Sequence, residues 1–131
     1  MHRIREDDLA TIDYIELPAR QLPETKAFYS NAFGWQWIDY GPTYAGTTGV
    51  APEIGLNAKA LTGRLQPLGS GDSIGPFVLF SSDDLEAVRI RILEAGGVIV
   101  SEPYAFPGGR RLHFQDPSGN VLGVYQGESS T

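Results

Sequence analysis

Residues 83–98 read Asp-Asp-Leu-Glu-Ala-Val-Arg-Ile-Arg-Ile-Leu-Glu-Ala-Gly-Gly-Val and carry the clearest helical pattern in the chain. Apolar residues recur there at helical spacing, which predicts an amphipathic helix with one buried face. These residues are Leu85, Val88, Ile92 and Ala95. Asp83 and Glu86 have the spacing of a capping box with aspartate as the cap, and Gly96-Gly97 predicts the end of the helix.

Strands are predicted on both sides of this helix. The apolar run Phe77–Phe80 precedes it, and three further stretches follow it, at residues 98–101, 111–115 and 120–125. The turn Asp116-Pro-Ser-Gly-Asn120 joins the last two, and its proline and glycine occupy positions that suit a type I turn. The second half of the chain therefore reads as a strand, a helix and three strands.

The first half repeats this order. Residues 11–17 predict a strand, and the stretch from Pro23 to Phe33 predicts a helix that Gly34 ends, as Gly96 does in the second half. Three strands are expected after this helix, at residues 35–40, 44–48 and 53–58. The order of elements is therefore an internal repeat.

A segment rich in glycine, serine and proline lies between the halves, at residues 62–75. We interpret it as a connector, because it lacks the glycine and lysine pattern of a phosphate-binding loop. The length of the chain favours one domain over residues 1–131. Its two modules are expected at about 10–60 and about 76–126.

The composition argues against several classes of function. The chain has no cysteine, which excludes disulfides and cysteine-based zinc sites. Its net charge of −6 repels phosphate backbones, so no nucleic-acid partner is expected. No apolar run approaches the roughly 20 residues of a membrane span. We therefore expect a cytoplasmic protein without a membrane partner.

Three segments resemble one known family. The first is Ile12-Asp-Tyr-Ile-Glu-Leu-Pro18 with Ala27-Phe-Tyr29 and Phe33-Gly-Trp35, the second is the helix of residues 83–98, and the third is Phe114-Gln-Asp-Pro-Ser-Gly-Asn-Val-Leu122. Their order and spacing resemble the glyoxalase, bleomycin-resistance and extradiol-dioxygenase superfamily, also called the vicinal oxygen chelate superfamily. The resemblance covers residues 11 to 126, roughly.

The resemblance implies a fold and an assembly. The fold is α+β, with two βαβββ modules forming an open, mostly antiparallel, barrel-like sheet around a pocket. The assembly is a homodimer, because many relatives complete or cover their barrels with a second chain. Both are expectations that come from the resemblance alone.

The resemblance also locates the metal ligands of metal-using relatives, in which side chains from four strands hold a divalent ion. The usual ligands are His, Gln and Glu. In this chain Tyr14, Phe77 and Gly123 occupy three of those positions, and the fourth lies within Ile54–Leu56. Tyrosine alone among these residues can donate to a cation. We therefore expect no metal and no other cofactor.

The alternation of side chains along strands gives a separate check on this placement. If Tyr14, Phe77 and Gly123 face the pocket, their strand neighbours must face the helices. Those neighbours are Ile15, Leu17, Val78, Phe80, Leu122 and Val124, and all of them are apolar.

An aromatic pocket with a few polar groups is expected in place of the metal site. The predicted ligand-binding residues are Tyr14, Glu16, Trp37, Tyr44, Phe77, Leu79, Tyr104, His113 and Tyr125. For any single aromatic residue, a plain core position is the more common role. Arg110 and Arg111 could present a cation to an anionic substrate, although for at least one of them a solvated loop position is favoured.

Glu16 and Tyr14 are the candidate catalytic residues. A carboxylate among aromatic rings is partly desolvated, which raises its pKa and suits an acid or base, although a structural pairing of Glu16 is more common. His113 joined to Glu16 or Glu53 would form a relocated metal site, which is the less favoured alternative.

Three functions follow from these residues. The first is a protein that binds or sequesters a small organic molecule without a metal, as drug-resistance relatives do. The second is a metal-independent lyase or isomerase that uses Glu16 or Tyr14 for proton transfer. The third, a metal-dependent glyoxalase or dioxygenase, is disfavoured by the missing ligands.

Overall fold

The computed structural model describes residues 12–59 and 77–128. The first module consists of β1 (Tyr14–Pro18), α1 (Leu22–Phe33), β2 (Gln36–Asp39), β3 (Tyr44–Thr48) and β4 (Glu53–Asn57). The second consists of β5 (Leu79–Ser81), α2 (Leu85–Glu94), β6 (Val98–Phe106), β7 (Gly109–Gln115) and β8 (Val121–Gly127). The predicted α+β fold of two βαβββ modules is confirmed, and the predicted connector at 62–75 lies outside the described residues.

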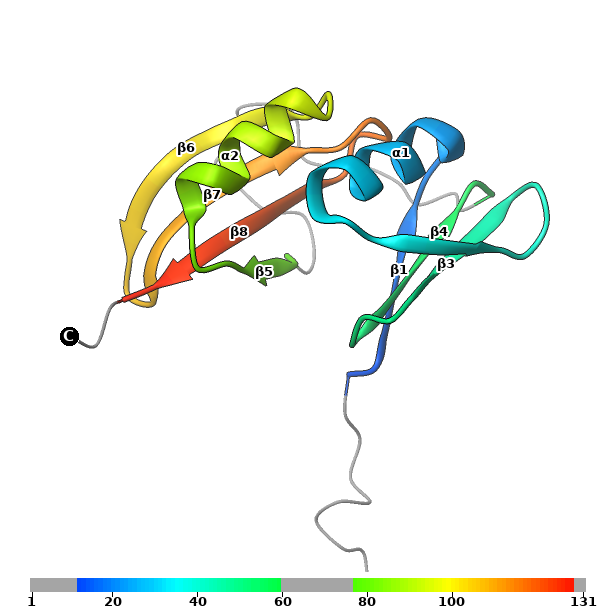
Figure 1. Cartoon of the computed structure of the whole chain (residues 1–131), viewed down its shortest axis with the longest axis horizontal. Coiled ribbons are helices and arrows are strands. Elements are labelled where there is room, and N and C mark those ends of the chain that lie inside the picture. The colour runs from blue at the N-terminus through cyan, green and yellow to red at the C-terminus, as the bar shows by residue number, and fades with distance from the viewer. Residues whose placement is uncertain (1–11, 60–76, 129–131) are drawn as a thin grey trace, which may run out of the picture.

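The two modules have the same topology. One four-stranded sheet has the order β1-β4-β3-β2, and the other has the order β5-β8-β7-β6. In each sheet the first and last strands of the module pair in parallel, and the remaining pairs are antiparallel. The sheets remain separate and do not close into a barrel (Figure 1).

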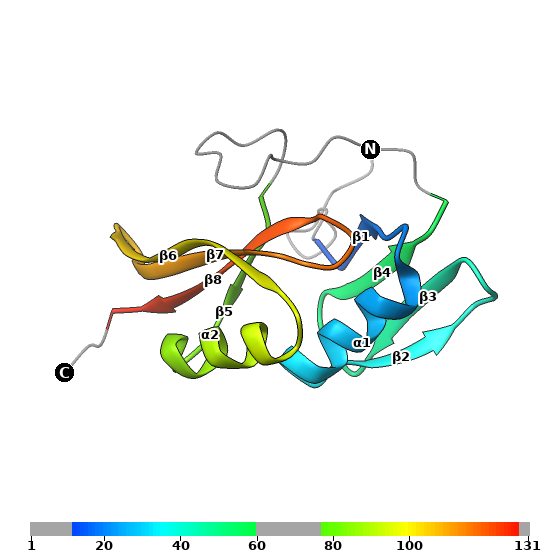
Figure 2. The same ribbon diagram turned by 90° about the horizontal axis from the view of Figure 1, so that it is seen from above.

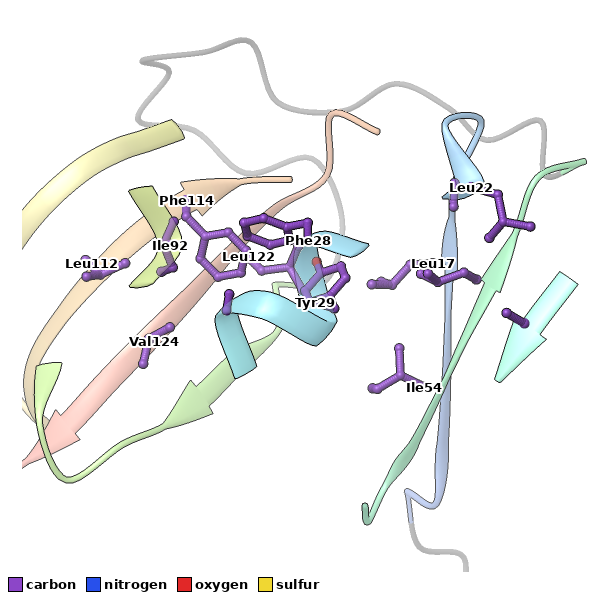
Figure 3. Packing of buried hydrophobic residues seen from close by; sticks show 14 of the residues in the cluster. Leu17, Leu22, Phe28, Tyr29, Ile54, Ile92, Leu112, Phe114, Leu122 and Val124 are labelled. Carbon is purple, nitrogen blue, oxygen red and sulfur yellow. The ribbon is translucent and has the colours of Figure 1, made fainter. Parts of the chain in front are cut away.

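Both helices lie on the same side of the molecule, next to one another (Figures 1 and 2). Phe28 and Tyr29 of α1 pack against Phe114 of the second sheet (Figure 3). Leu17 and Ile54 of the first sheet lie on the other side of α1 (Figure 3). Helix α1 is therefore the element that joins the two sheets into one core. Burial of these apolar side chains is the main stabilising contribution.

The face of each strand follows the predicted alternation. Leu17, Leu122 and Val124 are buried in the core, and the other predicted helix-facing residues pack against it. Those others are Ile15, Val78 and Phe80. The helical pattern is also confirmed, because Leu85 and Ile92 of α2 are fully buried.

The cap of α2 and the extent of β6 differ from the sequence predictions. The cap of α2 is Asp84 rather than Asp83, and its Oδ1 accepts a hydrogen bond of 3.1 Å from the backbone N–H of Ala87. Strand β6 extends to Phe106 instead of ending at residue 101. Its pairing with β7 shifts register on both sides of Ser101, and Pro103 lies in the irregular part. A bulge lets a strand continue past a proline that cannot donate to the ladder.

Candidate functional site

Most of the residues predicted for the site fall into two groups, one on each sheet, on the faces that point away from the helices. The tyrosine face belongs to the first sheet and the arginine face to the second. The tyrosine face consists of Tyr14, Glu16, Tyr44, Gly55 and Asn57. The arginine face consists of Phe77, Tyr104, Phe106, Arg111, His113 and Tyr125.

Hydrogen bonds connect the tyrosine face. The hydroxyls of Tyr14 on β1 and Tyr44 on β3 are 2.5 Å apart, and both cross Gly55 of the strand between them. The side-chain amide of Asn57 donates to Glu16 at 3.2 Å. Desolvation raises the pKa of Tyr44, and the bonds to Tyr14 and Glu16 add to this effect. The Tyr44 phenol is therefore neutral at physiological pH.

A cation surrounded by rings is the centre of the arginine face. The Cζ atom of Arg111 lies 5.0 Å from the ring centroid of Phe106, 5.4 Å from that of Tyr104 and 5.7 Å from that of Phe77. The Nε–H of Arg111 also donates to the Tyr104 hydroxyl at 2.5 Å. Cation–π attraction at these distances holds a guanidinium in a defined place.

The Tyr104 hydroxyl forms hydrogen bonds with both Arg111 and His113. Because arginine can only donate, the Tyr104 oxygen is the acceptor from Arg111, and its own proton can be donated to Nε2 of His113 at 3.1 Å. This arrangement requires His113 to be neutral with its proton on Nδ1. Burial lowers the pKa of His113, and the nearby charge of Arg111 lowers it further. The arginine face thus carries one positive charge rather than two.

Acidification should therefore destabilise the fold through His113. The unfolded chain takes up a proton near the ordinary histidine pKa of about 6.5, whereas the folded chain resists it. The contribution of neutral His113 to the free energy of unfolding is fully present above that pH. It is lost as the pH falls toward the lowered pKa of His113 in the folded chain. Denaturant midpoints of wild type and His113→Gln, from about pH 7.5 to about pH 5.5, measure this effect. The wild type should lose more stability than the variant, and equal losses would exclude His113 as the cause.

The structure separates one predicted residue, Trp37, from these groups and places another, Leu79, beside Phe77 at the edge of the arginine face. Trp37 pairs with Thr47 and donates from its indole nitrogen to the backbone oxygen of Lys26 at 3.2 Å, so it lies on the helix side. Its predicted place in the pocket is corrected, because alternation along β2 directs it to α1. Leu79 lies at the edge strand β5, close to Gly123.

A cleft of about 540 Å³ lies between the modules on the helix side, and the predicted site does not coincide with it. Apolar residues from both sheets and α1 dominate its lining, among them Ile15, Phe33, Ile54 and Phe80. Leu79 is the one predicted ligand-binding residue in that lining.

The residues at the family's metal-ligand positions do not fit a divalent cation. A side chain at Gly55 would collide with the hydroxyls of Tyr14 and Tyr44, and a Cβ at Gly123 would lie 2.6 Å from Leu79 and 3.0 Å from Phe77. Neighbouring side chains thus fill the space of the missing ligands. In the part of the chain that the structure describes, no group of three His, Cys, Asp or Glu residues could hold an ion.

A comparison with known protein families identifies the superfamily of the chain. The family model of the glyoxalase/bleomycin resistance protein/dioxygenase superfamily matches residues 11–124. The chain belongs to this superfamily. The match extends over both modules. It does not indicate whether the chain uses a metal or which substrate it takes.

Two curated proteins are similar to the chain in sequence. The chain is 28% identical over 118 residues to the anthracycline biosynthesis protein DauV of Streptomyces sp. strain C5, covering 88% of this chain and 41% of that protein. The anthracycline biosynthesis protein DnrV of Streptomyces peucetius matches to the same extent. The chain therefore spans about two-fifths of the length of these curated relatives.

Solved structures share the fold. TnmS3, an antibiotic binding protein from Streptomyces sp. CB03234, has a TM-score of 0.70 at 22% identity, with 92% of this chain and 98% of that chain covered. A superfamily enzyme from Burkholderia phytofirmans PsJN has a TM-score of 0.71 at 20% identity, with 91% of this chain and 100% of that chain covered.

No helix within the described residues is long and apolar enough to cross a membrane.

The sequence analysis did not distinguish which of the two adjacent arginines, Arg110 or Arg111, faces the site. Arg110 donates to Glu86 of α2 at 3.2 Å, so it lies on the helix side, while Arg111 lies among the rings of the opposite face. Alternation from the buried Leu112 and Phe114 would have separated them, because Arg110 shares their parity and Arg111 shares that of His113. Phe106 is not among the ligand-binding residues predicted from the sequence, although its ring lies against Arg111.

Proposed function

We propose that this protein binds a small, planar organic molecule on its arginine face without a metal ion. The main support is the cluster of aromatic rings around Arg111. One ring comes from the segment before β5 and two come from β6. Aromatic surfaces with a few fixed polar groups suit ligands of this kind. The glycines that replace metal-binding side chains support a role without a metal.

The relatives support the same class of ligand. One neighbour in fold is described as an antibiotic binding protein, and two curated relatives are described as anthracycline biosynthesis proteins. Anthracyclines contain planar fused rings, which stack well on aromatic side chains. A planar antibiotic or a related biosynthetic intermediate is therefore the proposed ligand.

A titration with anthracyclines and other planar antibiotics tests the proposal. Quenching of the protein's intrinsic fluorescence measures binding, and Tyr104→Ala should weaken the affinity by about tenfold, which corresponds to one ring contact of roughly 1.4 kcal/mol. Tyr40→Ala is the matched control, because Tyr40 is 63% exposed on the first module. Equal affinities of the two variants, or the absence of any binding, would contradict the proposal.

We propose in addition that two copies of the chain assemble into a homodimer. Large side chains with apolar surface remain exposed on the first module, including Tyr14 at 43%, Ile38 at 44% and Tyr40 at 63%. A second copy would cover such surface, and burial of apolar area favours association. Light scattering on the eluting protein measures its mass; a monomer across the accessible concentrations would exclude the dimer.

Proton-transfer catalysis is the second candidate function, and the tyrosine face is the observation that favours it. Tyr14, Tyr44 and Glu16 lie within one set of polar contacts, which places a carboxylate and two hydroxyls side by side as candidate proton-transfer groups. If a ligand that binds is also converted, Glu16→Gln should abolish turnover and leave binding unchanged. Turnover at the wild-type rate in that variant would remove Glu16 from the mechanism.

A further inference from the structure

The charge on Arg111 is not balanced by a carboxylate within the described residues. Two other arginines of the second module have such partners: Arg89 binds Glu102 through two hydrogen bonds of 2.7 and 2.8 Å, and Arg110 binds Glu86. For Arg111 the structure records aromatic rings and the neutral Tyr104 hydroxyl instead. This contrast is notable in a chain with 16 acidic residues.

Among the described residues, the guanidinium retains donors without an acceptor. Its Nε–H is used by Tyr104, and no acceptor for the terminal nitrogens appears among residues 12–59 and 77–128. The rings of Phe77, Tyr104 and Phe106 hold the guanidinium in position, so little side-chain freedom remains to be lost when an anion binds. A planar fork of donors matches a carboxylate in geometry as well as in charge.

We propose that the ligand of the arginine face is a planar aromatic anion, with a carboxylate or a comparably compact acidic group beside its ring, and that Arg111 selects it. The inference rests on the proposed function and names the chemical class of its ligand. The rings of the face stack on the flat part of the ligand, and the terminal nitrogens of Arg111 donate to its anionic group.

The rest of the face is consistent with this selection. Within residues 12–59 and 77–128, no acidic side chain belongs to the arginine face, so no described negative charge of this face opposes an anion. His113 lies beside Phe77, with ring centroids 4.7 Å apart, and in its neutral form it adds a donor at Nδ1 without a second charge. An acidic protein thus offers a local positive site to an acidic aromatic ligand.

A pair of probes that differ only in charge tests the selection. 2-Naphthoate and 2-naphthamide have the same rings and nearly the same shape, and calorimetry measures the affinity of wild type for each. The wild type should bind the carboxylate about tenfold more tightly. Arg111→Gln should reduce that preference to about unity, while the control Arg110→Gln, altered on the opposite face of the same strand, should retain it.

The binding results distinguish selection by Arg111 from ligand binding on the arginine face as such. Equal affinity of the wild type for both probes overturns the selection by Arg111 and leaves the proposed function intact. A carboxylate preference that persists in Arg111→Gln also overturns it, because another group would then be responsible. Binding of neither probe overturns both, provided that the antibiotic titration fails as well; if the antibiotics bind, it overturns the selection alone.

A second variant, Arg111→Lys, serves if Arg111→Gln misfolds. If Arg111→Gln does not fold, Arg111→Lys keeps the charge and loses the planar fork. The preference for the carboxylate should then fall below the wild-type value by several-fold while the affinity for the amide is unchanged. An unchanged preference in the lysine variant would overturn the role of the planar guanidinium.

Discussion

Replacing Asp116 by alanine should lower the free energy of unfolding by about 4 kcal/mol. Asp116 is only 2% exposed, and its carboxylate accepts four hydrogen bonds of 2.8 to 2.9 Å. The donors are the Tyr29 hydroxyl, the backbone N–H of Ser118, and the backbone and side-chain N–H groups of Asn120. Alanine would leave these buried donors without an acceptor, which costs more than the loss of the bonds themselves.

The effect should reach both modules. Tyr29 belongs to α1, and the side chain of Asn120 also donates to the backbone oxygen of Pro18 in β1 at 2.8 Å. The turn of the last hairpin therefore binds the helix and the first strand of the other module. Burial raises the pKa of Asp116, and the donated hydrogen bonds oppose that shift.

Urea denaturation of Asp116→Ala, Tyr29→Phe and the double variant measures this network. Because Asp116 and Tyr29 share one hydrogen bond, the double variant should lose less stability than the two single losses added together. Asp116→Asn should lose an intermediate amount, because its amide can still accept from the turn but donates where Tyr29 also donates. Additive losses, or a loss below about 1 kcal/mol for alanine, would show that the network is dispensable.

Phe114→Ala should be comparably destabilising, with a loss of about 3–5 kcal/mol. The Phe114 side chain is fully buried, and its ring lies 5.8 Å from those of both Phe28 and Phe33 and 6.1 Å from that of Phe80. Alanine would open a cavity where α1 meets the second sheet. A cavity at this place removes both the transfer energy of the ring and its packing contacts.

Phe106→Ala is the matched control for this loss. Phe106 is a half-buried phenylalanine on the opposite face of the same sheet, so its truncation should cost only about 1 kcal/mol. The urea midpoints of both variants, at an unchanged denaturant dependence, give the comparison. Equal losses would mean that the core is not centred where α1 contacts the second sheet.

The order and the buried faces of the elements were accessible from the sequence. The stripe of Leu85, Val88, Ile92 and Ala95 predicted the buried side of α2, and the alternation around Tyr14 predicted which strand residues meet the helices. Both predictions depend on the spacing of residues within one element, which backbone geometry alone converts into a direction.

The candidate site was only partly predictable. Tyr14, Glu16 and Tyr44 do share one face, and Phe77, Tyr104, His113 and Tyr125 share another. The resemblance implied one pocket for all of them, whereas the structure places the two groups on separate sheets. Within the four-residue strand β2, no pattern long enough existed to show that Trp37 faces α1.

By itself the sequence determined the order of the elements, their repeat and the inward face of most strands, because these depend on residue type and local spacing. Only the tertiary structure brought Arg111 together with three rings, since two of those rings lie on β6 beyond a bulge and the third precedes β5. Cross-strand neighbours depend on register, and the bulge near Pro103 sets a register that no single strand encodes.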